Sequence, residues 1–413
     1  MADRKKSPCK YGADCYRKNP QHREEYSHPE PASDKKDESA NGSENEKKRA
    51  HSIDPENESP KRTKDAEHHH HHPRMIDPYE AGEKSAEKAE YNELLSGDPA
   101  RFIKQIFYVT MPDDFYSFWE FCKSIVKPGS APEKVFEQFG LKLVGPFDVL
   151  AGKFKDFKRF EPVEYLTHWR FYYDPPEFQT ILVKDKTCIH FGYWRDDATV
   201  EKSEYLIARN DADKGYEMEM IAANIFQAIL CYFEKDFIAT PFNKAQVNKI
   251  KKQIEDWANE KGFSLTNSEE KINEREEKIL CRTFHRLGIV ANFDRKTKVG
   301  YRALQLSDAN LKKILDHFKT IDKNDKEAFN MAMEPLQPCI TAAYIAVDES
   351  DFATALELGI DLFCFGLEIL QDVARPLLIT GYTMLQRPQY IAISKTHLAN
   401  RRKGYDLDLL NRK

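Results

Sequence analysis

The residues best suited to chemistry lie at the start of the chain. Cys9, Cys15, His22 and His28 are separated by five, six and five residues, in a segment with almost no apolar side chain. Two thiolates and two imidazoles form a closed tetrahedral set that suits a structural zinc ion. So short a segment cannot fold on hydrophobic burial, whereas zinc binding can supply that free energy. We therefore predict a zinc finger over residues 1–30, with a ligand spacing unlike that of DNA-reading fingers.

The stretch from Cys9 to Pro29, "CKYGADCYRKNPQHREEYSHP", resembles the poly(ADP-ribose)-binding zinc finger. The resemblance implies that its cysteines and histidines hold zinc and that Tyr11, Tyr16 and Arg17 bind the polymer. These residue types suit the ligand, because tyrosine rings can stack on adenine and a guanidinium can grip phosphate with two hydrogen bonds. The alternative is a zinc ion that holds a small fold with no ligand.

A second candidate site is the acidic pair Asp348-Glu349 in "AVDESDFATALELG". The pattern indicates the start of a helix, with Ser350 or Asp351 as its cap. The acidic pair would then lie near the positive end of the helix dipole, which is favourable. Such a helix entrance requires no function beyond stabilising the helix.

A third candidate is Tyr301-Arg302 in "VGYRAL", where Gly300 permits a turn. An aromatic residue next to an arginine is a typical anchor of a protein interface. The alternative is a loop arginine beside a packed tyrosine.

Two other polar groups are interpreted as structural. In "HWRFYYDPPEF", alternation along an expected strand puts His168, Arg170 and Tyr172 on one face, so their proximity needs no catalytic explanation. Glu357 and Asp361 are one helical turn apart in an apolar helix and have no histidine in register. We predict that they belong to a buried or interface network.

The elements that must position these residues are of mixed type. Helical spacing of apolar residues in "MPDDFYSFWEFCKSIV" predicts a helix capped by Asp113 or Asp114. Aromatic and β-branched residues predict strands in "LKLVGPFDVLAG", "HWRFYYDPPEFQTILVK" and "KTCIHFGYWRDD". A hairpin turn is expected near Asp185-Lys186.

From Glu219 onward helical patterns dominate, beginning with "MIAANIFQAILCYF". We therefore predict an α+β fold with two subdomains. Residues 93–240 form a mixed α/β subdomain with an antiparallel sheet packed on helices. Residues 241–413 form a mainly helical subdomain that carries both the acidic pair and the tyrosine-arginine pair.

Residues 31–92 are predicted to be a disordered linker. From residue 31 to residue 67 there is no aromatic residue, and Ile53 is the one large aliphatic side chain. Such a composition cannot bury enough surface to offset chain entropy. Basic clusters at 47–49 and 61–64 resemble a bipartite nuclear import signal, and solvated charge in a disordered tract is the alternative.

The composition of the whole chain narrows the function classes. A formal net charge of -5 over 413 residues offers no whole-chain argument for nucleic acid binding. There is no signal peptide and no apolar run near 18 residues, so no contact with a membrane is expected. Six cysteines are scattered singly among apolar residues beyond the finger, a pattern typical of buried free thiols in a reducing compartment.

Several stretches over roughly residues 95–400 resemble the histone PARylation factor family. They are "MPDDFYSFWEFC", "LKLVGPFDVLAG", "HWRFYYDPPEFQTI", "GYRAL", "DESDFATALELGIDLFCFG" and "HLANR". The resemblance implies an accessory factor that binds DNA-damage-activated poly(ADP-ribose) polymerase and completes its active site. It also implies that ADP-ribose is directed onto serine in histones and other chromatin proteins.

By this resemblance Glu349 is the catalytic residue, and Asp348, Tyr301 and Arg302 face the polymerase. The chain would have no activity alone, and NAD would be bound by the polymerase. The partners implied are the polymerase, histones and poly(ADP-ribose), without direct DNA binding, in the nucleus at damaged chromatin. Ser350 replaces the family's cysteine, which should alter packing more than chemistry. The alternative function is a non-catalytic poly(ADP-ribose) reader or scaffold.

Overall fold

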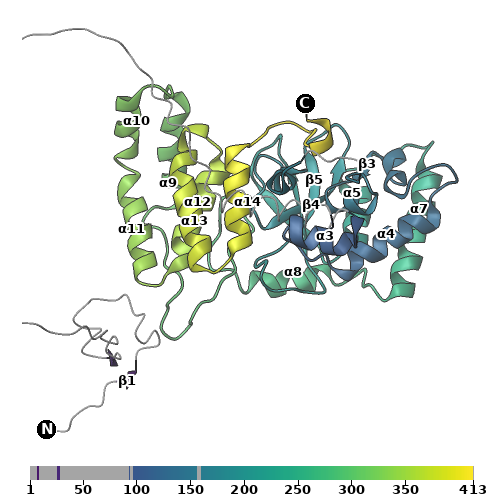
Figure 1. The fold of residues 1–413 in the computed structure, drawn as a ribbon, viewed down its shortest axis with the longest axis horizontal. Helices are drawn as coiled ribbons and strands as arrows, with labels where there is room; N and C mark the ends of the chain where they lie inside the picture. The colour runs from purple at the N-terminus through teal and green to yellow at the C-terminus, as the bar shows by residue number, and fades with distance from the viewer. Residues whose placement is uncertain (1–6, 9–25, 28–92, 94–95, 156–159, 413) are drawn as a thin grey trace, which may run out of the picture. The chain divides into compact units, whose positions relative to one another are not determined.

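The computed structural model describes residues 7–8, 26–27, 93, 96–155 and 160–412 (Figure 1). The chain divides into two compact units, Met1–Arg74 and Met75–Lys413. In the first unit strand β1 (Ser7–Pro8) pairs in parallel with β2 (Tyr26–Ser27). The predicted linker lies outside the described residues, as do the predicted zinc ligands and polymer-binding residues Cys9, Cys15, His22, His28, Tyr11, Tyr16 and Arg17.

The second unit begins with an antiparallel sheet of five strands, joined in sequence order. The strands are β3 (Leu141–Leu143), β4 (Phe178–Lys184), β5 (Ile189–Trp194), β6 (Ile207–Asp211) and β7 (Met218–Ala222). Lys186 turns the β4–β5 hairpin with a φ of 56°, where the sequence predicted a turn. Neighbouring strands are also neighbours in sequence. The connection from β3 to β4 contains α5 and η4, and the later strands follow one another more directly.

Helices pack on this sheet and complete what we call the sheet part. They are α3 (Pro99–Ile106), α4 (Asp113–Ile125), α5 (Pro146–Leu150), α6 (Ile225–Lys235), α7 (Lys244–Lys261) and α8 (Ser268–Glu276), with 3₁₀ turns η2 (Pro132–Lys134), η3 (Glu137–Phe139) and η4 (Pro162–Thr167). As predicted, α4 buries Phe115, Phe118, Trp119 and Cys122. A single apolar core runs from α3 through the sheet to α7.

The helical part follows, and Figure 1 shows its green and yellow helices standing together beside the sheet part. It contains α9 (Asp308–His317), α10 (Lys326–Met333), α11 (Gln337–Asp348), α12 (Phe352–Phe365), α13 (Gln371–Met384) and α14 (Pro388–Ala399), with 3₁₀ turns η5 (Phe318–Thr320) and η6 (Glu368–Leu370). The last 3₁₀ turn, η7 (Leu409–Asn411), returns to the sheet part, where Leu409 joins the first core. A second core, largely between residues 281 and 398, holds these helices together.

Helix α12 is central to the helical part, because every residue from Ala353 to Cys364 is buried. A helix that is buried on all sides must be surrounded by other elements. Two glycines allow α13 to approach it closely. A Cβ on Gly359 would lie 2.9 Å from the amide nitrogen of Leu378, and one on Gly381 would lie 2.8 Å from the Cβ of Leu356.

The α+β prediction is confirmed, with the sheet preceding the mainly helical part. The predicted subdomain boundary near residue 240 stays a prediction. The described residues contain six cysteines, all of them free thiols and five of them buried, as the sequence predicted. Within the described ranges, no helix combines the length and apolarity that crossing a bilayer requires.

Three local predictions are wrong. Residues 168–173 form turns before β4 rather than a strand, and Trp169 has a φ of 53°. The stretch after β3 turns into α5, and the stretch after Glu219 first completes β7 before α6 begins. In the last two cases short apolar runs fit both a strand and a helix, and packing decides between them.

The predicted cap of α4 is also wrong. Pro112 occupies the N-cap position, without a side-chain capping bond. Asp114 instead accepts hydrogen bonds from the Tyr193 hydroxyl and the Ile225 amide, both at 2.7 Å. Asp114 therefore binds the first turn of α6 from a buried position. This burial raises the pKa of Asp114 to about 7.

Candidate functional site

The candidate catalytic carboxylate lies in the turn between α11 and α12, which we call the acidic turn (residues 348–351). Asp348 is the last residue of α11 and Glu349 is its C-cap, so the prediction that the pair starts a helix is wrong. At the C-terminal end of α11 the helix dipole disfavours a negative charge. Ser350 adopts a left-handed φ of 72°, which reverses the chain into α12. The acidic pair therefore needs another source of stabilisation.

For Glu349 that stabilisation comes from Arg302, 47 residues away in sequence. Its Nη2 donates to the Glu349 carboxylate, and its Nε donates to Asp351 Oδ2 at 2.7 Å. The side chains of Arg302 and Glu349 are 44% and 55% exposed, whereas that of Asp351 is 8% exposed. The hydrogen bonds to Asp351 and Glu349 raise the pKa of Arg302. Arg302 thus connects a buried carboxylate to an accessible one.

The 300–302 segment is fixed to the start of α12 by its backbone. The Gly300 amide donates to Asp351 Oδ1 at 2.9 Å, and the Ala353 amide donates to the Gly300 carbonyl at 3.2 Å. The Arg302 amide donates to Thr354 Oγ1 at 3.0 Å, and that hydroxyl donates back to the Arg302 carbonyl at 2.8 Å. Asp351 occupies the predicted N-cap position of α12, but its carboxylate binds this segment instead of the amides of α12.

Gly300 is required by this geometry. Its φ is +124°, and a Cβ at this position would lie 2.5 Å from the Asn292 carbonyl oxygen. Only glycine adopts such a backbone conformation at low cost. The turn predicted from "VGYRAL" is therefore confirmed.

The Tyr301 side chain packs against the second core, near the Glu357 carboxyl and the Cys281 thiol. Burial is the main cause of a raised pKa in all three groups, and the pKa of Glu357 rises to about 7. Asp361, one turn further along α12, accepts from the Phe284 amide at 2.8 Å. Glu357 and Asp361 are both buried, as predicted, and Asp361 is held by a backbone amide.

The polar groups of "HWRFYYDPPEF" are structural, as predicted. His168 Nε2 and Asp148 Oδ2 are 2.7 Å apart in the interior. The Arg170 guanidinium donates to the carbonyls of Leu166, Pro175 and Phe178. These interactions tie turns to strands, so they leave no free acid or base for chemistry.

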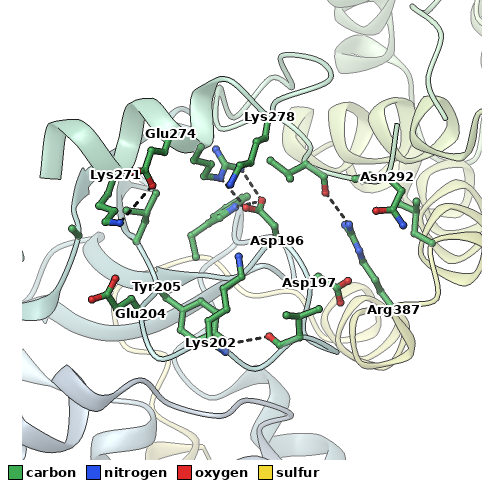
Figure 2. A pocket seen from close by; sticks show the side chains of 18 residues that line it. Asp196, Asp197, Lys202, Glu204, Tyr205, Lys271, Glu274, Lys278, Asn292 and Arg387 are labelled. Carbon is green, nitrogen blue, oxygen red and sulfur yellow. Dashed lines mark hydrogen bonds and ion pairs between the residues drawn. The ribbon is translucent and has the colours of Figure 1, made fainter. Parts of the chain in front are cut away.

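A pocket of about 460 Å³ lies apart from the acidic turn, between α8, the loop after β5 and residues 290–292 (Figure 2). Its charged lining residues nearly balance in number: Lys202, Lys271, Arg275, Lys278 and Arg387 against Asp196, Asp197, Glu204 and Glu274. Arg275 forms two hydrogen bonds of 2.9 Å with Asp196, and Lys271 pairs with Glu274 at 3.5 Å. None of the predicted site residues lines this pocket, and its paired charges indicate no particular ligand.

Comparison with known proteins identifies the family. A family model for histone PARylation factor 1 matches residues 98–401, and a model for the PBZ domain matches residues 6–31. The chain belongs to the histone PARylation factor 1 family. Histone PARylation factor 1 of Bos taurus is 36% identical over 318 residues, which cover 76% of this chain and 90% of the relative.

Other members of the histone PARylation factor 1 family match to a similar extent. The Mus musculus protein is 36% identical over 325 residues, covering 77% of this chain and 92% of the relative. The Danio rerio protein is 37% identical over 303 residues, covering 72% of this chain and 84% of the relative. The family match includes both the 300–302 segment and the acidic turn, and the PBZ match includes every predicted finger residue.

Two residues of the site were not found from the sequence. Asp351 was considered only as a helix cap and Thr354 was not singled out, yet together they hold the 300–302 segment. Their spacing of three residues on an apolar helix was a usable signal, because polar residues on one buried face require partners. Among the described residues, no group of histidine, cysteine and acidic side chains could hold a metal ion.

Proposed function

We propose that this chain is an accessory subunit of DNA-damage-activated poly(ADP-ribose) polymerase that directs ADP-ribose onto serine in histones and other chromatin proteins. Glu349 supports this proposal most directly. It is a half-exposed carboxylate on a turn held by the bonds of Arg302, Asp351 and Thr354. A carboxylate presented in this way can enter the active-site cleft of another protein.

The proposed role of Glu349 is that of a general base. A serine hydroxyl is a weak nucleophile at neutral pH and must lose its proton as its oxygen bonds to the anomeric carbon of NAD. Nicotinamide leaves as that bond forms, and the proton passes to the Glu349 carboxylate. A positioned base accelerates such a step by roughly 10²- to 10⁴-fold. The polymerase binds NAD and supplies the rest of the site, so this chain alone has no activity.

Arg302, Tyr301 and Asp348 are proposed to face the polymerase. The Arg302–Glu349 ion pair is about half exposed, and pairs of this kind typically contribute less than about 1 kcal/mol. A partner can therefore engage Arg302 at small cost and leave the Glu349 carboxylate free to accept a proton. Arg302→Ala should fold normally and fail to co-elute with a DNA-activated polymerase. Wild-type affinity in this variant would place the interface elsewhere.

The PBZ domain is proposed to bind zinc through Cys9, Cys15, His22 and His28, a donor set that suits tetrahedral zinc. It would recruit the chain to poly(ADP-ribose) through Tyr11, Tyr16 and Arg17. Replacing both Tyr16 and Arg17 by alanine should weaken polymer binding by the zinc-loaded full chain without releasing zinc. Unchanged polymer binding would leave the finger a purely structural role.

The deciding experiment is a reconstitution with polymerase, damaged DNA, NAD and a histone peptide in which serine is the only acceptor. Glu349→Gln preserves shape and removes the base, so it should abolish serine modification and leave the complex intact. Asp316→Asn is the matched control, because Asp316 is a half-exposed, ion-paired carboxylate outside the acidic turn, and this variant should retain serine transfer. If Glu349→Gln supports serine transfer at the wild-type rate, the proposal of a composite active site is wrong, and the reader or scaffold function takes its place.

A further inference from the structure

A short run of basic residues immediately precedes the 300–302 segment. Residues 293–299, with the sequence "FDRKTKV", form what we call the basic loop. Its cations Arg295, Lys296 and Lys298 are all exposed, and none of them forms an ion pair with another described residue. They give this loop a compact cationic surface, which attracts anions.

Hydrogen bonds hold the basic loop in one conformation. Asp294 Oδ1 accepts from the Lys296 amide at 2.8 Å and from the Thr297 amide at 3.2 Å. The Asp294 amide donates to the Val299 carbonyl at 2.9 Å, and the Lys298 amide donates to the Asp294 carbonyl at 2.7 Å. The one acidic side chain of the loop is therefore used to close the turn, and the cations extend from a backbone that is already ordered.

Lys298 occupies a backbone position that a smaller residue would fill at lower cost. Its φ is 60°, in the left-handed region that glycine and asparagine adopt most readily. Its ammonium lies over the Phe293 ring, 6.0 Å from the ring centroid. The turn itself does not require a lysine here, whereas a role for its charge would explain why one is present.

The basic loop leads directly into the candidate catalytic site. The Gly300 amide, next in the chain, donates to Asp351 in the acidic turn. Two residues further on, Arg302 pairs with Glu349. An anion held by the basic loop would therefore be attached, through this short segment, to the turn at which ADP-ribose is proposed to join its acceptor.

We propose that the basic loop binds the pyrophosphate groups of poly(ADP-ribose), so that the chain holds the polymer beside the acidic turn as well as at the PBZ domain. A guanidinium grips phosphate with two hydrogen bonds, and lysines add point charges. This inference rests on the proposed function, in which the PBZ domain binds polymer and ADP-ribose is transferred at Glu349. Duplex DNA fits the loop less well, because DNA-binding proteins spread cations over many phosphates and this chain has a net charge of -5.

The size of the effect follows from three exposed contacts. Each exposed ion pair contributes roughly 1.4- to 5-fold in affinity, so three contribute roughly 3- to 150-fold. On a flexible single strand each phosphate contact adds about 0.7 to the slope of log affinity against log salt, so three add about 2. Between about 50 and 200 mM salt, the chain with its loop cations should then lose about 20-fold more affinity than a chain without them.

The test measures binding of the zinc-loaded full chain to poly(ADP-ribose) of one defined length, at about 50 and 200 mM salt and without polymerase or NAD. It is made with the wild-type finger and with the finger variant Tyr16→Ala, Arg17→Ala, in which the remaining binding reports contacts outside the finger. In both backgrounds the loop variant Arg295→Ala, Lys296→Ala, Lys298→Gly should bind roughly 3- to 150-fold more weakly and lose about 2 from the salt slope. Its thermal midpoint should not fall, because Lys298→Gly keeps the left-handed backbone at lower cost.

Asp294 tests whether the order of the loop matters beyond its charge. Asp294→Asn and Asp294→Ala remove the same charge, but the asparagine amide oxygen can still accept from the Lys296 amide. Asp294→Asn should therefore bind the polymer at least about twofold more tightly than Asp294→Ala, in which the loop must be ordered on binding. Equal affinities in the two variants would contradict a preordered site.

The matched control removes three lysines from the surface of α7, by Lys244→Ala, Lys249→Ala and Lys251→Ala. None of them forms an ion pair with another described residue, and the change in charge equals that of the loop variant. This control should change polymer affinity by less than about twofold. A loss as large as that of the loop variant would overturn the inference, because the whole charge of the chain, and not the loop, would then be responsible.

Three other results would also overturn the inference. The first is a finger variant without any residual polymer binding at low salt. The second is a loop variant that loses more affinity for duplex DNA than for poly(ADP-ribose), which would make the loop a DNA contact. The third is a loop variant that binds polymer normally but binds a DNA-activated polymerase weakly, which would make the loop part of the protein interface.

These readouts separate this inference from the proposed function. Polymer binding is measured without polymerase or NAD, so it does not depend on whether Glu349 is the base. Normal polymer binding by the loop variant, together with loss of serine transfer in Glu349→Gln, would overturn the role of the basic loop and keep the proposed function. Normal serine transfer in Glu349→Gln, together with weak polymer binding by the loop variant, would have the opposite meaning.

Discussion

Asp351 supports the local structure of the site, and replacing it tests the structural reasoning directly. Its carboxylate accepts from the buried Gly300 amide at 2.9 Å and from Arg302 Nε at 2.7 Å. Hydrogen bonds to a charged group are worth about 1.5–3 kcal/mol, and alanine would also leave the Gly300 amide without its partner. The Arg302 side chain is 44% exposed, so solvent screening reduces its bond to about 0.5–1 kcal/mol.

Asp351→Ala should therefore lower the free energy of unfolding by about 2–4 kcal/mol. Denaturant unfolding of the full chain measures this loss. Asp351→Asn is the control, since its amide oxygen can still accept from Gly300, and it should lose only about 1 kcal/mol. Hydrogen exchange at the Gly300 amide should accelerate in Asp351→Ala, whereas the Phe284 amide, held by Asp361, should not change.

Two results would refute this reasoning. The first is an Asp351→Ala variant within about 0.5 kcal/mol of the wild type, the range of ordinary surface substitutions. The second is an equal loss in Asp351→Asn and Asp351→Ala, which would mean that the charge, and not the bond to Gly300, stabilises the turn.

Three further predictions concern stability and location. Burial raises the pKa of Glu177 from 4.5 to about 7, so its contribution to the free energy of unfolding is complete below about pH 4.5 and is lost as the pH rises through 7. In unfolding experiments between pH 4.5 and 8, Glu177→Gln should remove about 3 kcal/mol of this pH-dependent loss. A pH profile of the variant that runs parallel to that of the wild type would contradict this prediction. Gly381→Val should destabilise the chain by more than about 2 kcal/mol in thermal unfolding, because the new Cβ would lie 2.8 Å from the Leu356 Cβ. An unchanged thermal midpoint would show that α12 and α13 can move apart without cost. Replacing Lys47, Lys48, Arg49, Lys61 and Arg62 by alanine should make the protein cytoplasmic by microscopy, and unchanged nuclear accumulation would contradict the predicted import signal.

Predictions from the sequence succeeded where the decisive interactions are local. The apolar spacing of residues 113–125 located α4, and the helix expected after a cap at Ser350 or Asp351 corresponds to the buried helix α12. The hairpin near Lys186 was also found, because turn residues and flanking β-branched residues are neighbours in sequence.

Predictions failed where a polar side chain had a choice of partners. Asp114 has the position of a helix cap, yet it binds the Ile225 amide 111 residues away. Residues 168–173 have the composition of a strand, yet Arg170 binds three backbone carbonyls that only a turn brings together. In both cases a buried polar group takes the partner that packing supplies, and the local pattern does not contain that information.

The sequence by itself determined the α+β class, the PBZ domain at residues 6–31 and the membership in the histone PARylation factor 1 family, and it singled out the candidate pairs Asp348-Glu349 and Tyr301-Arg302. Only the tertiary structure decided that the acidic pair ends α11 instead of starting α12, and that Arg302 connects Glu349 to Asp351. The physical reason is the distance along the sequence between the residues that interact. Helix periodicity and metal-ligand spacing can be recognised within a few neighbouring residues. The partners of a buried or half-buried charge lie on chain segments that meet only when the core forms.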